Sequence, residues 1–179
     1  MLSVVISIFI LGAAVVWFII TYYDFLFLQK NIVQSAANLQ LLLDQRNEEV
    51  GTLIQTIKGH NAYEQKVIID LAKARAQLIK AKDNKEKAEH DIATSKHMKS
   101  VLDIQKHYPK LHSHEKFARI QTLEMELQNA RQLRSETIST YNAAREKFPR
   151  NIIAATCSFK KEEDFYAISD QVSHPAAQQ

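Results

Sequence analysis

Glycine, proline and cysteine are scarce in this chain. Among its 179 residues there are only three Gly, three Pro and one Cys. β-Sheets need Gly and Pro at their turns, and phosphate-binding loops need Gly where the backbone approaches the anion. The scarcity therefore argues against sheet proteins and nucleotide-binding folds, and it predicts an all-α protein. The single Cys157 excludes an internal disulfide and a CxxC metal or redox site.

Excess charge and catalytic signatures are also lacking. The chain has 23 basic and 20 acidic residues, a net charge of +3, which gives no case for nucleic-acid binding. No GxSxG, P-loop or HExxH pattern occurs in it. We therefore expect no nucleic-acid partner, no cofactor and no enzymatic activity.

Charged side chains are missing from the first segment, residues 1–23, and the first one is Asp24. As a helix, this segment would span about 34 Å at about 1.5 Å per residue, enough to cross a hydrocarbon core of about 30 Å. Trp17, Tyr22 and Tyr23 lie near its downstream end, where aromatic rings favour the headgroup layer. A cleaved signal peptide is the alternative, but it would have basic residues before a shorter apolar run and a small-residue cleavage site after it.

The sequence thus predicts an uncleaved single-pass membrane anchor, with the bilayer as a partner of residues 1–23. Lys30 is the only basic residue among the twenty that follow the anchor. The positive-inside rule therefore favours a cytoplasmic C-terminal domain only weakly.

Residues 24–168 show helical periodicity, with apolar side chains at spacings of three and four. Asn47 predicts a helix start that ends the preceding helix near Arg46, and Asp83 followed by Glu86 resembles a capping box. Tyr141 and Phe148 belong to the apolar stripe of the last helix. The pattern predicts helices over 24–46, 47–80, 83–108 and 112–148, hence an antiparallel up-and-down four-helix bundle with long helices after the transmembrane helix. Residues 169–179 read as a flexible tail.

Residues 80–100 are rich in lysine and almost without an apolar face. The simpler interpretation is a solvated tip of the bundle with local ion pairs. The alternative is a contact for anionic lipid or an acidic protein, made by basic side chains at four positions. These are Lys80, Lys82, Lys85 and Lys87.

Two further clusters leave alternatives open. His107, His112 and His114 could hold a metal only if their rings converged, and a solvated turn is the favoured interpretation. Glu64 falls on the core stripe of the second predicted helix, where an unpaired carboxylate would be costly. We expect either that it pairs with Arg131 or Arg134, or that it reaches water at the edge of the stripe.

The C-terminal half contains a run, YNAAREKFPRNIIA, that begins at Tyr141. With Tyr108-Pro109, Arg46 and the segment LIQTIKGHNAYE ending at Glu64, this run resembles the bacterial LemA family. Gly51 stands where that family usually has Pro at the start of its second helix. The resemblance implies a single-pass membrane protein with an extended helical bundle and no established catalytic activity.

The favoured hypothesis is a non-enzymatic scaffold that self-associates or recruits a partner at the membrane. Tyr141 and Asn142 would then be packing determinants on the core side of the last helix, with Asn142 bonded to a neighbouring helix. Phe148 and Pro149 would end that helix, with Ile152 and Ile153 covering its base, and Asn151 is a further structural residue of the run. The rival hypothesis is a membrane-surface module that uses the lysine-rich segment.

Overall fold

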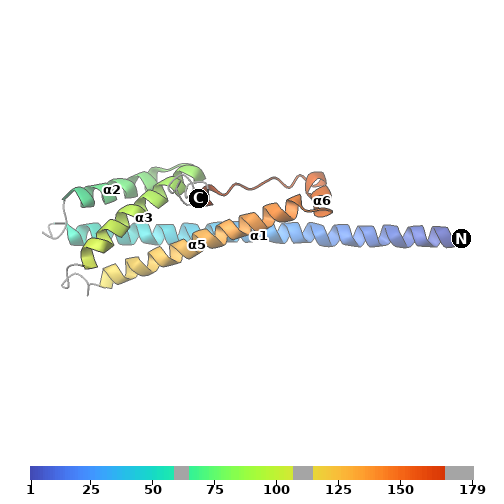
Figure 1. Ribbon diagram of the computed structural model, residues 1–179, viewed down its shortest axis with the longest axis horizontal. Helices are drawn as coiled ribbons and strands as arrows, with labels where there is room; N and C mark the ends of the chain where they lie inside the picture. The colour runs from blue at the N-terminus through green and yellow to red at the C-terminus, as the bar shows by residue number, and fades with distance from the viewer. Residues whose placement is uncertain (59–64, 107–114, 168–179) are drawn as a thin grey trace, which may run out of the picture. The chain divides into compact units, whose positions relative to one another are not determined.

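The computed structural model describes residues 1–58, 65–106 and 115–167, and within these ranges it contains helices and no strand (Figure 1). The predicted all-α class is therefore confirmed. The helices are α1 Leu2–Ile57, α2 Gln65–Lys80, α3 Asn84–Lys106, α5 Glu115–Glu146 and α6 Arg150–Thr156.

The predicted break near Arg46 is wrong, because α1 continues without interruption to Ile57. Asn47 lies inside the helix, where its backbone carbonyl accepts a hydrogen bond from Arg75 Nε at 2.7 Å. Gly51 is no break either: a Cβ there would lie 2.9 Å from the Arg75 guanidinium, so the missing side chain lets Arg75 cover α1. A buried stripe continues through this region of α1, and its burial stabilises the helix more than the capping preference of Asn47 favours a new helix start. Beyond residue 38 the stripe consists of five apolar residues and one arginine: Leu39, Leu43, Arg46, Val50, Leu53 and Ile57.

Other predicted boundaries are closer. At the start of α3, Asp83 Oδ1 accepts the Glu86 N–H at 2.7 Å, which is the first bond of a capping box. Glu86 Oε2 accepts the Lys82 N–H at 3.2 Å, so its bond reaches the residue before the cap and not Asp83 itself. The last long helix ends at Glu146, close to the predicted end, and the short α6 that follows Pro149 was not predicted.

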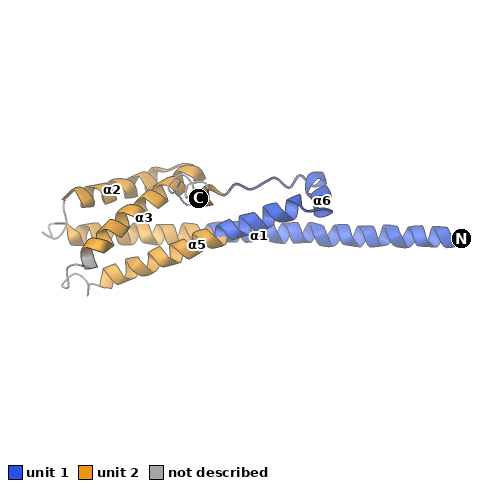
Figure 2. Ribbon diagram, viewed as in Figure 1, with its two compact units in different colours: residues 1–36, 134–163 blue, residues 37–133, 164–179 orange. Residues whose placement is uncertain are grey.

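The chain divides into two compact units, which Figure 2 colours separately. Unit 1 consists of residues 1–36 and 134–163, and unit 2 of residues 37–133 and 164–179. Helices α1 and α5 each contribute to both units.

Unit 2 is a bundle of four helical segments from α1, α2, α3 and α5. Glu49 pairs with Arg119 while Arg46 pairs with Glu124, so α1 and α5 run antiparallel in it. Consecutive helices joined by short connections account for this up-and-down order. One apolar cluster contains Val50, Leu53, Ile57, Leu71, Met98, Val101, Phe117 and Ile120, and a second contains Leu39, Leu43, Ala88, Leu127, Ala130 and Tyr166.

Unit 1 has its own apolar core, formed by α1, α5, α6 and the segment after α6. The rings of Phe25 and Phe159 stack with centroids 4.9 Å apart, and Tyr141 meets Phe25 edge-on at 6.2 Å. Cys157 is a free, partly buried thiol that packs against this core, as expected of a packing cysteine.

The N-terminal part of α1 has a different surface. Residues 1–20 are all exposed, although nearly all are apolar. Its most apolar 18-residue window has a mean hydropathy of 2.8, and within the described ranges it is the one helix long and apolar enough to cross a membrane. A helix that could span a membrane thus lies near the N-terminus, where the span is predicted.

Candidate functional site

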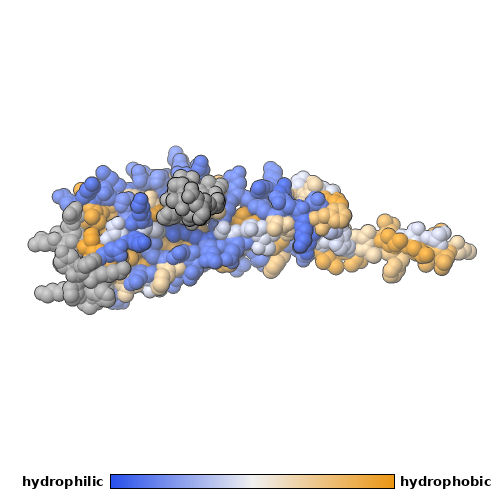
Figure 3. All heavy atoms as spheres, viewed as in Figure 1, coloured by the Kyte–Doolittle hydropathy of each residue, from blue (hydrophilic) through white to orange (hydrophobic). Residues whose placement is uncertain are grey.

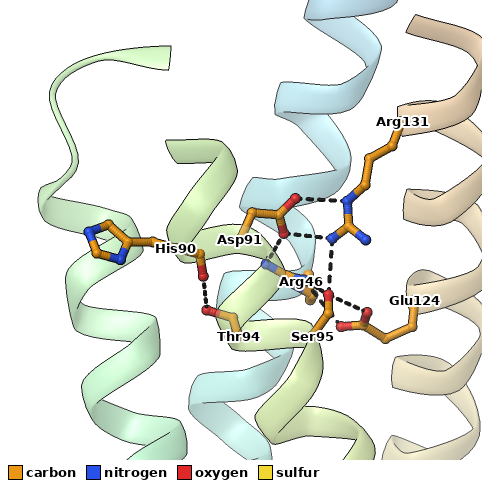
Figure 4. A network of polar contacts seen from close by, with 7 residues as sticks. All are labelled: Arg46, His90, Asp91, Thr94, Ser95, Glu124 and Arg131. Atoms are coloured by element: carbon orange, nitrogen blue, oxygen red, sulfur yellow. Dashed lines mark hydrogen bonds and ion pairs between the residues drawn. The ribbon is translucent and has the colours of Figure 1, made fainter. Parts of the chain in front are cut away.

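A network of charged side chains lies inside unit 2, with members from α1, α3 and α5 (Figure 4). Arg46 of α1 is completely buried, although it carries a permanent charge. Its Nη2 atom donates to Asp91 Oδ1 at 2.5 Å, and its Nη1 atom donates to Glu124 Oε1 at 3.2 Å. The guanidinium of α1 therefore joins two carboxylates from two different helices.

Asp91 of α3 is the centre of the network and is also completely buried. Arg131 of α5 binds it through two parallel hydrogen bonds, from Nε to Oδ2 at 2.8 Å and from Nη2 to Oδ1 at 2.7 Å. This bidentate geometry is the strong form of the arginine–carboxylate pair. Asp91 thus lies between two guanidinium groups.

Ser95, one turn after Asp91, completes the arrangement. Its hydroxyl donates to Glu124 Oε2 at 2.8 Å and accepts from Arg46 Nη1 at 2.8 Å and from Arg131 Nη2 at 2.9 Å. Two arginines and two carboxylates give the network a net charge of zero. Such compensation is what makes buried charge tolerable, and loss of one partner would leave an unbalanced charge inside the bundle.

Burial and charge act together on the pKa values of neighbouring groups. Burial lowers the pKa of Arg131, but the charge and hydrogen bonds of Asp91, together with the charges of Glu124 and Tyr166, raise that pKa by more. Burial together with the negative charge of Asp91 raises the pKa of Tyr166, whose ring lies 5.9 Å from the Arg131 guanidinium carbon. Both shifts favour the charged form of Arg131 and the neutral phenol of Tyr166.

Neither Arg46 nor Asp91 is predicted as a buried site residue. A charged residue on a core stripe, the signal that singles out Glu64, also marks Arg46 on the buried stripe of α1. The prediction of a solvated tip for residues 80–100 is wrong for one face of α3, whose buried residues in that range are Ala88, Asp91, Thr94 and Met98. Two of these four are polar, so the face has no apolar pattern in the sequence. Asp91 binds arginines of two other helices, and Thr94 donates to the His90 carbonyl of its own helix.

A second polar arrangement lies in unit 1, where α5 holds the extended segment 159–162. The Tyr141 hydroxyl donates to the Lys160 carbonyl at 2.9 Å, and Arg145 Nε donates to the Phe159 carbonyl at 3.1 Å. Burial raises the pKa of Tyr141, which favours the neutral donor form. Tyr141 and Arg145 both belong to the Tyr-Asn-Ala-Ala-Arg run. Their spacing along α5 lets both side chains bind the backbone of segment 159–162.

Asn142 makes the third attachment. Its Nδ2 atom donates to the Glu162 carbonyl at 2.9 Å, and its Oδ1 atom accepts the Glu162 N–H at 3.1 Å. A side-chain amide that bonds both backbone groups of one residue imitates a β-ladder pairing. Asn142 thus bonds an extended segment, and the prediction that it bonds a neighbouring helix is wrong.

The end of α5 departs from prediction. Phe148 is 77% exposed and Ile152 is 55% exposed, so neither packs as expected, whereas Ile153 is buried. Phe148 follows the end of α5, where the turn carries its ring away from the core stripe. Pro149 and Asn151 are exposed after the end of α5, and the position of Pro149 agrees with a helix-ending role.

The remaining candidate residues have mixed outcomes. Arg131 binds Asp91, and Arg134 Nη1 is buried with no hydrogen-bond partner in the described part of the chain. The pairing of either arginine with Glu64 stays a prediction. Lys80, Lys82 and Lys85 are exposed and Lys87 is half-buried. Several predicted residues lie outside the described ranges: Glu64, Tyr108, Pro109, His107, His112 and His114.

In both arrangements, the polar side chains form hydrogen bonds and ion pairs with other groups of the protein itself. Within the described ranges no cluster of His, Cys, Asp or Glu could hold a metal ion. The hydrogen-bonding capacity of Asp91 and Ser95 is used within the bundle, so both positions act on packing and register.

Comparisons with known proteins agree with these features. The model of the LemA family matches residues 35–178, which is most of the chain. Among curated proteins, no significant match to the chain was found.

Proposed function

Because the chain belongs to the LemA family, we propose that it is a non-enzymatic, membrane-anchored helical scaffold that self-associates or recruits partner proteins at the bacterial cell membrane. The observation that supports this most directly is the course of α1. One helix includes the exposed apolar segment of residues 1–20 and also Arg46, a buried member of the bundle's polar network. A single element thus serves both as anchor and as core helix.

The buried network supports a structural role for the bundle. Its arginines and carboxylates bind one another across three helices, with distances between 2.5 and 3.2 Å. Polar groups buried in this way are well suited to set the register of a bundle, because a shifted register would leave charges unpaired. A bundle with a defined register presents a defined surface, which is what a scaffold requires.

For localisation, we propose the inner membrane with the C-terminal domain in the cytoplasm. The support for this orientation is the position of Lys30, a basic residue close after the apolar segment. Protease added to spheroplasts tests it, with a tag at the C-terminus. The tag should resist digestion until the membrane is permeabilised. Digestion of the tag in intact spheroplasts would contradict the cytoplasmic orientation.

The scaffold proposal is tested by affinity isolation of the full chain from native membranes in a mild detergent. Mass spectrometry identifies bound proteins, and light scattering gives the mass of the complex. We expect a complex heavier than one 20.5 kDa chain plus detergent, either as a homo-oligomer or with a second protein in fixed ratio. A control with residues 1–23 fused to an unrelated soluble domain removes proteins that bind the span alone. A monomer without a stoichiometric partner would refute the proposal.

A second candidate function is supported by the exposure of Lys80, Lys82 and Lys85 around the turn between α2 and α3. Such a cluster could bind anionic lipid or an acidic protein, and the attraction would be screened by salt. A chain that lacks residues 1–23 should then float with anionic liposomes at low salt and be released at high salt. Replacement of the three lysines by glutamine should abolish this binding, and equal flotation at both salt concentrations would contradict the electrostatic mechanism.

A further inference from the structure

The turn between α5 and α6 exposes large apolar side chains beside positive charges. Phe148 is 77% exposed and Ile152 is 55% exposed, while Ile153 and Ala154 of the same short helix are buried in the core of unit 1. Lys147 and Arg150 lie next to Phe148 and Pro149 in sequence. Apolar groups of this size at the tip of a turn, flanked by basic residues, are typical of segments that enter a membrane interface.

The position of this turn within unit 1 relates it to the anchor. A groove is lined by Trp17 of α1 together with residues of the turn. Arg150 Nη2 also lies 3.0 Å from Asp24 Oδ2, which places α6 beside the first charged residue after the apolar run. The other residues that line the groove extend from the last turn of α5 to the first residue of α6: Ala144, Lys147, Phe148, Pro149 and Arg150.

The stretch of α1 beside the turn is the stretch at which the anchor would leave the bilayer. A hydrocarbon core of about 30 Å requires about 20 helical residues, and the uncharged run ends just before Asp24. Trp17 and Asp24 therefore bracket the interfacial layer. Figure 3 shows apolar surface over α6 as well as along the N-terminal part of α1.

We propose that the α5–α6 turn is a second membrane contact, in which Phe148 and Ile152 insert into the interfacial layer of the bilayer that α1 crosses. Lys147 lies at the level of the lipid phosphates, and the Arg150–Asp24 pair marks the aqueous boundary. The inference rests on the proposed anchoring by α1. Continuity with the anchor and the positive charge of the turn indicate a lipid surface as the occupant.

Depth-dependent fluorescence quenching tests this contact in the full chain. Trp17 is the only tryptophan, so Trp17→Phe with Phe148→Trp moves the single fluorophore to the turn. The protein is reconstituted into phosphatidylglycerol and phosphatidylcholine vesicles whose acyl chains carry bromine near the headgroup. We expect the tryptophan at position 148 to lose much of its emission and to have a blue-shifted maximum. The exposure of Phe148 makes the replacement tolerable to the fold.

A matched control places the fluorophore at Met125, which is 57% exposed on α5. Trp17→Phe with Met125→Trp should keep its emission in brominated vesicles. Equal quenching at positions 148 and 125 would overturn the proposal. A blue shift at position 148 without quenching would also overturn it, because a protein surface would then cover the turn.

The natural Trp17 separates this inference from the anchoring on which it rests. Quenching of Trp17 in the unmodified chain is expected if α1 is inserted. Quenched Trp17 with an unquenched position 148 would overturn the second contact alone. Unquenched Trp17 would overturn the anchoring and the second contact together.

Discussion

Replacement of Asp91 by Asn removes one charge from the centre of the buried network and changes its shape very little. Asp91 accepts three hydrogen bonds from two arginines, at 2.5, 2.8 and 2.7 Å. In the variant, Arg46 and Arg131 face only the charge of Glu124. The network then has a net charge of +1 inside the bundle, and Arg46 has no route to water because it is completely buried.

The expected loss of stability follows from this unbalanced charge. Removal of one partner from a buried ion pair typically costs about 3–5 kcal/mol. For a chain of this size about 1 kcal/mol corresponds to about 2–4 °C in the unfolding midpoint, so the midpoint should fall by about 6–20 °C. The measurement is thermal unfolding of the full chain in detergent, followed by circular dichroism at the helical band.

A double variant distinguishes charge imbalance from simple loss of hydrogen bonds. Arg46→Met should destabilise the natural protein, because it leaves the network with a net charge of −1. In the Asp91→Asn background the same replacement restores a net charge of zero, with Arg131 facing Glu124. We therefore expect partial recovery of stability, with a coupling of about 1–3 kcal/mol between the two positions.

The control for these measurements is Glu89→Gln, which removes an exposed carboxylate from the same helix. Its effect should stay within about 0.5 kcal/mol. An Asp91→Asn variant that loses less than about 1 kcal/mol would refute the reasoning, as would additive effects of Arg46→Met and Asp91→Asn.

Three further predictions concern other contacts. The pKa of Tyr166 is raised in the folded protein above its ordinary value of 10.0. The contribution of the neutral Tyr166 phenol to the free energy of unfolding is therefore complete below pH 10.0 and is lost as the pH rises further. In pH-dependent denaturation, Tyr166→Phe should reduce this loss of stability at alkaline pH. Asn142→Ala removes both hydrogen bonds to Glu162 and should lower the local stability of that segment by about 1 kcal/mol. Hydrogen exchange of the Glu162 amide should then be about fivefold faster. Asp83→Ala removes the N-cap of α3 and should lower stability by about 1 kcal/mol in thermal unfolding.

Each of these predictions has a control and a contrary result. For Tyr166→Phe the unmodified protein is the control, and an alkaline profile equal to that of the unmodified protein would contradict the assignment. Asn151→Ala alters an exposed asparagine and should leave the Glu162 amide unchanged, whereas equal acceleration would rule out a specific bond. Lys85→Ala, in the first turn of α3, should be nearly neutral, and an equal loss there would argue against the capping box.

The sequence by itself determined the features that depend on near neighbours along the chain. The absence of charge over residues 1–23 predicted the span, the scarcity of Gly and Pro predicted helices, and Asp83 with Glu86 predicted the start of α3. Each is a local property, since helix periodicity and capping act within one or two turns. The run from Tyr141 to Ala154, together with Tyr108-Pro109, Arg46 and the segment ending at Glu64, likewise indicated the family.

Only the tertiary structure decided which polar residues lie inside. Arg46 meets Asp91 over a separation of 45 residues and Glu124 over 78, so no local pattern reveals that its charge is compensated. Asn47 predicts a helix start because the capping preference depends only on neighbouring residues. In the structure, burial of the stripe before and after Asn47 stabilises α1 as one continuous helix. Phe148 looked like a core residue for the same reason. Burial is decided by the helices that surround a side chain, and these come from distant parts of the sequence.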